Sequence, residues 1–244
     1  MSKKNELDPR RWSDLPEWSD LPGFMQKEEV RPYYNALCKH RVGLKFKRVF
    51  DIVVAWIMLV ILAIPMGIVA ILIKTDSPGP VFYRQERVTT YGSVFNIHKF
   101  RTMVQNADKI GSAVTVSGDS RITKVGQRIR GLRIDEIPQL FDVIEGTMSF
   151  VGPRPEAVKY VKQYTPKMMA SLLLPAGVTS EASIRYKNEA DLLDAADDVD
   201  RVYVEQVMPA KMRWNLESVR KYCFLREIAT CFRTLAAVLG KEYV

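Results

Sequence analysis

The sequence predicts a helix-dominated α+β fold with one membrane-inserted helix, and three observations carry this prediction. An uncharged apolar run of twenty-two residues from Ile52 to Ile73 meets the length of a membrane helix. A loosely alternating stretch from Val81 to Phe100, interrupted by a polar turn, indicates a short β-hairpin. Most of the chain after Pro155 has apolar residues at helical spacing. With 244 residues and 47% hydrophobic content, the chain can bury one sizeable core.

The composition narrows the classes of function. The chain carries 36 Lys+Arg against 28 Asp+Glu, which favours an anionic partner such as a lipid headgroup, a nucleotide or a nucleic acid. Cys38, Cys223 and Cys231 are widely spaced and form no CxxC motif, so reduced thiols are expected rather than disulfides or a zinc site. The two histidines exclude a His-rich metal centre. No apolar stretch lies within the first thirty residues, so no cleavable secretion signal is expected.

A polar N-terminal arm is predicted over residues 1–44. It contains a small repeat, Trp12-Ser-Asp-Leu-Pro16 followed by Trp18-Ser-Asp-Leu-Pro22, and it shows no periodic apolar face. Such a segment is expected to be poorly ordered, with tryptophans that touch the membrane interface or a partner. A specific docking motif is the alternative.

Cations flank the apolar run on both sides. Five Lys/Arg and no acid lie between Lys39 and Arg48, and further cations begin at Lys74. Because lysine and arginine favour the cytoplasmic side, both flanks are expected there. Pro65, near the middle, removes a backbone donor and kinks the helix. A broken helix that enters and leaves by one face fits these observations, and so does a tilted span with a proline kink.

The predicted hairpin leads into a basic region. It ends at Lys99-Phe100-Arg101-Thr102-Met103, which is either a solvated strand end or a phosphate clamp. Apolar residues then recur at helical spacing from Ile122 to Leu132 and predict an amphipathic helix. Its neighbourhood carries cations without an acid: Arg121, Lys124, Arg128, Arg130 and Arg133. A solvated face is the usual meaning of such a run, but this one leads directly into an acid pair, which favours a functional role.

Asp135 and Glu136 form that acid pair. A carboxylate among arginines stays ionised and can act as a nucleophile or a metal ligand. Further along, Pro153 and Pro155 hold Arg154 in an extended segment. The nucleotide-binding motifs GxxxxGK[ST] and GxGxxG are absent from the sequence, as are the hydrolase motifs GxSxG and HExxH. Nucleic-acid binding is not expected, because no helix-turn-helix, zinc-finger or basic-zipper pattern appears.

Helical patterns fill the C-terminal part, over residues 156–164, 189–196 and 199–207 and, longest, over 216–239. Arginines and a lysine lie beside the apolar stripe of the last pattern. This helix either packs against the core or lies on anionic lipid.

Several short motifs follow one another in order along the chain: Lys47-Arg48-Val49-Phe50-Asp51, Gly79-Pro80-Val81-Phe82, Arg84-Gln85-Glu86-Arg87, Lys99-Phe100-Arg101-Thr102-Met103, Asp119-Ser-Arg121-Ile-Thr123, Asp135-Glu136-Ile137-Pro138-Gln139-Leu140, Met148-Ser149, Val151-Gly152-Pro153-Arg154-Pro155 and Pro175-Ala-Gly177-Val-Thr179. In this series the chain resembles the bacterial sugar transferases, or monotopic phosphoglycosyl transferases, in their minimal form. The resemblance covers residues from about 45 to the C-terminus. It departs where many members continue with Gly-Trp-Ala-Gln and this chain reads Ser180-Glu181-Ala182-Ser183.

The resemblance implies an architecture. Residues 45–75 are expected to form a re-entrant membrane helix, broken near Pro65 with both ends cytoplasmic. Residues 76–244 are expected to form one cytoplasmic catalytic domain that contains the short β-hairpin and interfacial amphipathic helices. The implied location is the bacterial cytoplasmic membrane, with membrane lipids as partners. A second copy of the chain, in a homo-oligomer, is a further candidate partner.

The resemblance also implies a reaction. A hexose-1-phosphate is transferred from a UDP-sugar to undecaprenyl phosphate with release of UMP, as the first membrane step of exopolysaccharide, capsule or glycoprotein glycan assembly. Asp135 is then the expected nucleophile that forms a covalent phosphosugar intermediate, and Glu136 is expected to bind Mg²⁺ or to position the acceptor. Either carboxylate is a candidate metal ligand.

Physical chemistry supports these roles, because phosphoryl transfer needs neutralised phosphate oxygens and Mg²⁺ binds few protein oxygens. The candidates for phosphate contact are Lys99, Arg101, Arg130 and Arg154, and Gln139 is a candidate for the uracil. A non-catalytic membrane-anchored scaffold and an anionic-lipid-binding protein are the alternatives.

Overall fold

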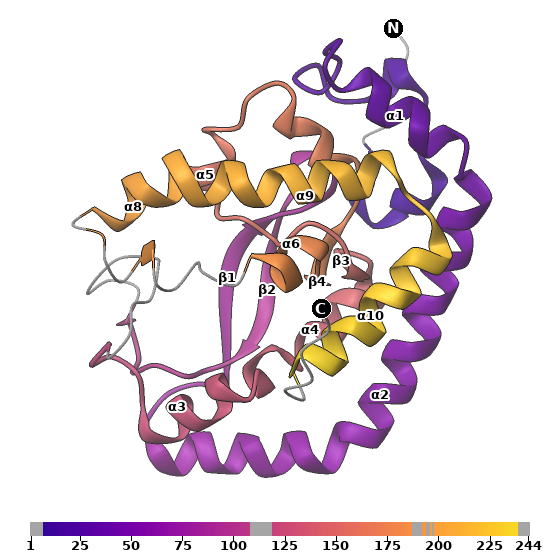
Figure 1. The fold of residues 1–244 in the computed structure, drawn as a ribbon. Helices are drawn as coiled ribbons and strands as arrows, with labels where there is room; N and C mark the ends of the chain where they lie inside the picture. Colours follow the sequence, from indigo (N-terminus) through magenta and orange to yellow (C-terminus); the bar gives the residue numbers. More distant parts are fainter. Residues whose placement is uncertain (1–6, 108–118, 187–191, 194–195, 197, 239–244) are drawn as a thin grey trace, which may run out of the picture.

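The computed structural model describes residues 7–107, 119–186, 192–193, 196 and 198–238. Helices dominate these residues, and the described strands form two small two-stranded sheets among them (Figure 1). The predicted helix-dominated α+β class is therefore confirmed.

The N-terminal residues fold against the rest of the protein. Their elements are η1 (Pro9–Asp14), η2 (Trp18–Asp20) and α1 (Arg31–Cys38). Trp12 is 0% exposed, and it packs with Leu15 and Leu21 in the largest apolar cluster, which also contains Leu173 and Val219 from the distant C-terminal half. The expectation of a poorly ordered arm is therefore wrong for the described residues. The repeated Trp and Leu side chains supply the burial that short-range periodicity does not reveal.

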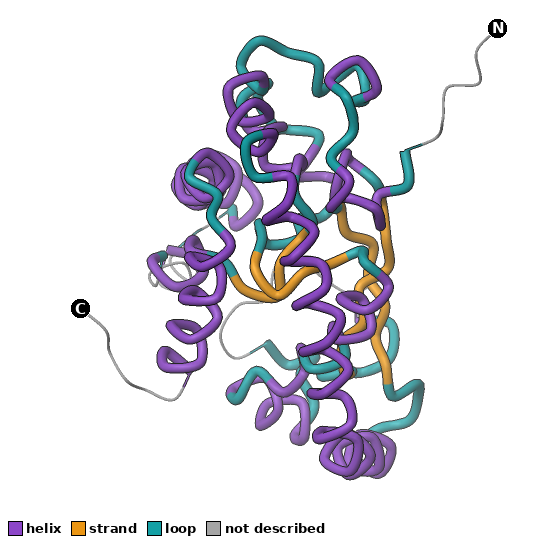
Figure 2. The backbone as a smooth tube through the Cα atoms, turned by 90° about the vertical axis from the view of Figure 1, so that its right-hand side faces the viewer, coloured by secondary structure: helices purple, strands orange, loops and turns teal. Residues whose placement is uncertain are grey.

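Helix α2 (Arg41–Asp76) contains the apolar run and bends sharply, as Figures 1 and 2 show from two directions. Pro65 lies inside it, and a helical proline is an identifiable cause of such a kink. Among the described residues, this one helix is long and apolar enough to cross a membrane. Only 11% of its most apolar stretch is buried, whereas a core helix of a soluble protein is mostly buried. Many of its apolar side chains, including Val60 and Ile64, are exposed.

The predicted hairpin is confirmed as strands β1 (Phe82–Val88) and β2 (Val94–Phe100), which pair antiparallel. The register sets Lys99 opposite Tyr83 and His98 opposite Arg84. Figure 1 shows β1 and β2 side by side near the middle of the view.

Sequence reasoning missed a second sheet, in which β3 (Met148–Val151) and β4 (Ala176–Thr179) pair in parallel. A Cβ on Gly177, within β4, would overlap backbone atoms of Gly152, which directly follows β3, and a Cβ on Gly152 would overlap the Pro175 carbonyl. Glycine at both positions is therefore a packing requirement.

The remaining elements are η3 (Thr90–Gly92), α3 (Lys124–Gly131), η5 (Ile134–Glu136), α4 (Gln139–Glu145), α5 (Val158–Val161), η6 (Met168–Leu173), α6 (Glu181–Arg185), α8 (Val199–Val202), η7 (Tyr203–Val207), α9 (Met208–Arg220) and α10 (Phe224–Val238). The amphipathic helix predicted over 122–132 is α3. The long helix predicted over 216–239 is wrong as a single element, because the chain turns between α9 and α10. Helix α5 is shorter than the pattern over 156–164, and most of the pattern over 189–196 lies outside the described residues.

Helix α4 is central to the arrangement of the site. Its Leu140 and Val143 pack with Ala55 of α2 and with Ile97 of β2 in a second apolar cluster. The membrane-type helix, the hairpin and the segment that carries the acid pair therefore share one core.

Candidate active site

The acid pair occupies η5, a single turn between α3 and α4. Upstream, the Thr123 side chain caps α3 by accepting the Gly126 N–H at 3.0 Å. A Cβ on Gly126 would overlap the Thr102 carbonyl, so glycine lets α3 pack directly on the segment that follows the hairpin. Arg133 then adopts a left-handed conformation with φ 57° and ψ 19°. Such a backbone costs a non-glycine residue about 1 kcal/mol or more and is often found at functional sites.

Glu136 is surrounded by cations from three parts of the chain. Its Oε1 lies 3.2 Å from Lys99 Nζ of β2, 3.2 Å from Arg154 Nη2 and 3.7 Å from Arg133 Nη1. Burial alone raises the pKa of this carboxyl, but Arg154, Lys99 and Arg133 outweigh it and lower the pKa to about 2. Glu136 is therefore ionised at neutral pH, and its charge is already compensated.

Asp135 is in a different electrostatic environment. Burial raises the pKa of its carboxyl, the neighbouring Glu136 raises it further, and the fields of Lys99, Arg130 and Arg133 oppose these effects only in part. Among the described residues no ion pair forms with Asp135. Two adjacent carboxylates whose pKa values are moved in opposite directions indicate divided roles. Glu136 organises the cations, and Asp135 is available to react or to bind a metal.

Two of the four predicted phosphate-binding residues lie directly at the pair, namely Lys99 and Arg154. Burial lowers the pKa of the Lys99 amine, Glu136 raises it, and Arg154 lowers it further. Arg130 acts on Asp135 through its field, and no hydrogen bond of its side chain occurs within the described part of the chain. Gln139 begins α4 and is buried, with 3% of its surface exposed.

Arg101 has different partners. Its guanidinium donates to the Ser77 carbonyl at 2.7 Å, to the Pro78 carbonyl and, at 3.5 Å, to the Ile73 carbonyl. These carbonyls lie at the C-terminal end of α2, where helix carbonyls lack intrahelical partners. The structure therefore places Arg101 at the end of the apolar helix and not beside the acid pair.

The structure adds a partly buried His–Asp contact that the sequence reasoning missed. Asp142 of α4 accepts the His98 backbone N–H at 2.9 Å and its Nδ1 at 2.7 Å, and His98 Nε2 contacts the Arg84 guanidinium. Because arginine has no acceptor, Nε2 must accept and Nδ1 must carry the proton. This contact holds α4 against the free edge of β2. His98 directly precedes Lys99 in the sequence, and this position beside a candidate phosphate-binding residue is the signal that could have pointed to His98.

Buried charges attach the start of α2 to β3 and to α10. Lys47 Nζ donates to the Val151 carbonyl at 3.0 Å and forms an ion pair with Glu227 of α10. One turn later, Asp51 accepts the Ser149 hydroxyl at 2.7 Å. Lys47 and Asp51 are 2% and 1% exposed. Strand β3, which leads to Arg154, is therefore fixed to the apolar helix.

Arg48 completes this attachment at the end of α4. Its guanidinium donates to the Val143 carbonyl at 2.6 Å and to the Ile144 carbonyl at 2.8 Å. Helix C-termini attract cations because their last carbonyls are unpaired. The Lys-Arg-x-x-Asp segment thus orients the elements on both sides of the acid pair.

The acid pair suits Mg²⁺ better than a metal held wholly by protein. Among the described residues no group of three His, Cys, Asp or Glu is arranged to hold a metal ion. Mg²⁺ commonly takes one or two carboxylates and completes its shell with water and substrate phosphate. Asp135, which forms no ion pair with any residue that the structure describes, and the adjacent Glu136 fit this pattern.

Comparisons with known proteins identify a matching family and several relatives. A family model described as bacterial sugar transferase matches residues 42–241. The chain is 35% identical, over 79% of its length and 43% of the relative, to a UDP-N-acetylgalactosamine-undecaprenyl-phosphate N-acetylgalactosaminephosphotransferase of Aeromonas hydrophila. It is 36% identical, over 67% of its length and 37% of the relative, to a UDP-glucose:undecaprenyl-phosphate glucose-1-phosphate transferase of Klebsiella pneumoniae. A protein of Caulobacter vibrioides with the same name is 32% identical over 80% of the chain and 70% of the relative. The chain thus spans about two fifths of the length of the first two relatives.

Proposed function

The chain belongs to the bacterial sugar transferase family, and from this premise we propose that it transfers a hexose-1-phosphate from a UDP-sugar to undecaprenyl phosphate with release of UMP. This is the first membrane step of exopolysaccharide, capsule or glycoprotein glycan assembly. The observation that carries the proposal is the divided acid pair, with Glu136 held by three cations and Asp135 left without an ion pair among the described residues.

The proposed reaction has two displacements at one phosphorus atom. In the first, a carboxylate oxygen of Asp135 attacks the sugar-proximal phosphorus of the UDP-sugar, the bond to the bridging oxygen breaks, and UMP leaves with that oxygen. In the second, a phosphate oxygen of undecaprenyl phosphate attacks the same phosphorus. The bond to Asp135 breaks, the carboxylate is restored, and the product is a polyprenyl diphosphate sugar.

The surrounding cations supply electrostatic stabilisation. Lys99 and Arg154 are 20% and 34% exposed at their side chains, so both can be reached by a substrate while they contact Glu136. Their charges favour the extra negative charge on the phosphate oxygens during transfer. Mg²⁺, which Asp135 and Glu136 would hold, adds Lewis-acid neutralisation of the same oxygens when bound. Gln139 stays a prediction for the uracil contact.

We assign Arg101 a supporting part in this scheme. Its bonds to the Ser77 and Pro78 carbonyls, directly after α2, keep that end of the helix beside the hairpin. The cations proposed to contact phosphate are then Lys99 and Arg154. Arg130 is proposed to act more remotely, because its positive charge lowers the pKa of Asp135.

Both ends of α2 bind the same domain, which supports a re-entrant path in the membrane. The N-terminal end is fixed through Lys47 and Asp51, and at the other end Asp76 accepts the Val125 N–H of α3 at 2.9 Å. A spanning helix would place its two ends on opposite sides of the bilayer. A bent helix whose ends share one domain enters and leaves by one face, which we propose is the cytoplasmic face.

Cysteine labelling tests this topology. In a chain whose three natural cysteines are replaced, single cysteines at Lys39 and at Arg84 should both be shielded from an impermeant thiol reagent added outside intact cells. Labelling of one position and not the other would mean that α2 spans the membrane.

The chemistry is tested by trapping the covalent adduct. Purified protein mixed with a UDP-sugar radiolabelled in the sugar should carry labelled hexose phosphate on Asp135, located by mass spectrometry of peptides. Asp135→Asn should lose both the adduct and turnover, whereas the exposed Asp20→Asn should keep them. Unchanged turnover in Asp135→Asn would remove this residue from its assigned role. Membrane association without transfer of any UDP-sugar by the unmodified chain would instead support a scaffold.

A further inference from the structure

A groove of about 650 Å³ opens between α1, η6 and α9, away from the acid pair. None of its lining residues belongs to η5, to the hairpin or to the segment around Arg154. In Figure 1, α1 and α9 lie in the upper part of the molecule, whereas α3, which precedes the acid pair, lies at the bottom. The site proposed for sugar-phosphate transfer leaves this groove without a role.

The floor of the groove is apolar. Met212 and Leu216 lie four residues apart on one face of α9 and are buried, and Met168 of η6 adjoins them. A floor of this kind favours a planar or apolar portion of a ligand, since methionine adapts its shape to varied partners. The volume lies within the range of about 300–1,000 Å³ that is usual for small-molecule sites.

The walls of the groove are strongly basic. Lys167, Arg213 and Arg220 are exposed in it, and within the described ranges none of these three side chains forms an ion pair. Glu217 is the acid of the lining, and it is already paired with Lys221 at 2.6 Å. The groove therefore holds three uncompensated positive charges.

The positions of these cations favour a ligand with more than one negative charge. Arg213 and Arg220 are seven residues apart on one face of α9, which separates their Cα atoms by about 10 Å. Lys167 stands before η6, so the charges converge on the groove from two elements. A single carboxylate would leave two of them unpaired. A phosphate ester carries roughly −1.5 to −2 charges and suits the planar guanidinium groups.

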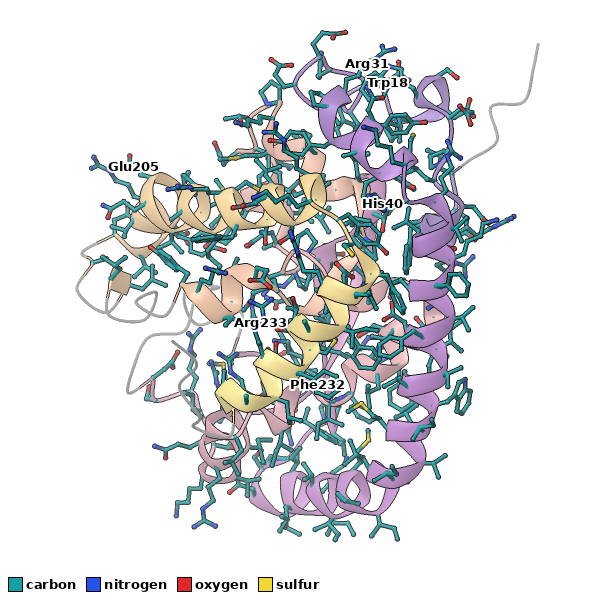
Figure 3. All side chains as sticks on the ribbon, turned by 45° about the vertical axis from the view of Figure 1, so that its right-hand side comes forward. Trp18, Arg31, His40, Glu205, Phe232 and Arg233 are labelled. Atoms are coloured by element: carbon teal, nitrogen blue, oxygen red, sulfur yellow. The ribbon has the colours of Figure 1, made fainter. Side chains whose placement is uncertain are left out.

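We propose that this groove is a second ligand site, which binds a soluble nucleotide with its phosphates against Lys167, Arg213 and Arg220 and its base on the methionine and leucine floor. A phospholipid headgroup offers the same phosphate chemistry. The exposed apolar side chains that mark a lipid-facing surface lie elsewhere, on α2 and on α10, where Phe232 is 68% exposed (Figure 3), and none lines the groove. The position of the groove therefore favours a soluble nucleotide over a phospholipid headgroup as the source of the phosphate.

The test is isothermal titration of the full chain in neutral detergent micelles, with UDP as the probe. A triple variant, Lys167→Gln/Arg213→Gln/Arg220→Gln, should lose one bound UDP per chain or weaken that site at least tenfold. A matched control, Lys27→Gln/Lys39→Gln/Lys162→Gln, removes the same charge from exposed positions outside the groove and should bind as the unmodified protein does. Because all six side chains are exposed, both variants should melt at the temperature of the unmodified protein.

The outcomes separate this site from the acid pair. Lys99→Gln should weaken a UDP site at the pair and leave the groove site intact. Unchanged UDP stoichiometry and affinity in the groove variant would overturn the proposal, whatever Lys99→Gln does. Binding to phosphatidylglycerol vesicles is the last measurement. If the groove variant loses vesicle binding while its UDP binding is unchanged, the groove takes a lipid headgroup and the nucleotide assignment is wrong.

Discussion

Replacement of Trp12 by alanine tests whether the N-terminal segment is part of the core. The side chain is fully buried, and a tryptophan of this kind removes roughly 150–250 Å² from water, or about 4–6 kcal/mol at 25 cal/mol per Å². Its indole Nε1 is buried without a hydrogen-bond partner among the described residues, so the variant also removes an unpaired donor that costs about 1–3 kcal/mol. Removal of the unpaired donor offsets part of the lost burial. The free energy of unfolding is therefore expected to fall by about 3 kcal/mol.

The second copy of the repeat provides the matched control. Trp18 is half-buried, and its ring lies 5.2 Å from that of Tyr34 and 5.2 Å from the Arg31 guanidinium, as Figure 3 shows for the Trp18 and Arg31 pair. Loss of these two contacts in Trp18→Ala is worth about 1–2 kcal/mol.

Thermal unfolding in detergent micelles, followed by circular dichroism, measures both effects. For a protein of this length each kcal/mol lowers Tm by about 2–4 °C, so Trp12→Ala should melt about 6–12 °C lower and Trp18→Ala about 2–8 °C lower. Equal losses in the two variants, or a loss below about 2 °C in Trp12→Ala, would refute the packing of the N-terminal segment into the core.

Three further predictions concern the charged groups. Lys47→Ala leaves its buried carboxylate partner without a counter-ion and should cost about 3–5 kcal/mol in unfolding experiments, whereas the exposed Lys45→Ala should cost less than about 1 kcal/mol. Glu136 has its pKa lowered to about 2 from an ordinary 4.5, so the stability it contributes is complete above pH 4.5 and is lost as pH falls towards 2; Glu136→Gln should flatten Tm over that window. His98→Asn, which keeps a donor towards Asp142, should retain more turnover than His98→Phe, and equal turnover would contradict the alignment of α4 by this contact.

The sequence was informative where a residue type has one dominant use. Adjacent carboxylates among arginines predicted a candidate site at Asp135 and Glu136. The structure places Lys99 and Arg154 beside Glu136. The uncharged run before and after Pro65 likewise predicted an apolar helix that the structure shows as bent.

Other features depend on partners far away in the chain. The N-terminal repeat looked unstructured because the apolar cluster that holds Trp12 is completed by residues distant in sequence, among them Leu173 and Val219. The parallel pair of four-residue strands was missed because strands this short carry no readable alternation. Arg101 looked like a phosphate ligand because cations at a strand end are equally suited to helix carbonyls, and only the fold shows which group is near.

The attachment of α2 also bears on how the protein is made. The partners of Lys47 and Asp51 in β3 lie 104 and 98 residues later in the chain. At about 5–20 residues per second, a ribosome releases the apolar segment several seconds before those partners exist. The two charges must stay hydrated during that interval, since their burial requires the later strand. The attachment of the N-terminal end of α2 to β3 is therefore a late step of folding, which is completed after the downstream strand has been synthesised.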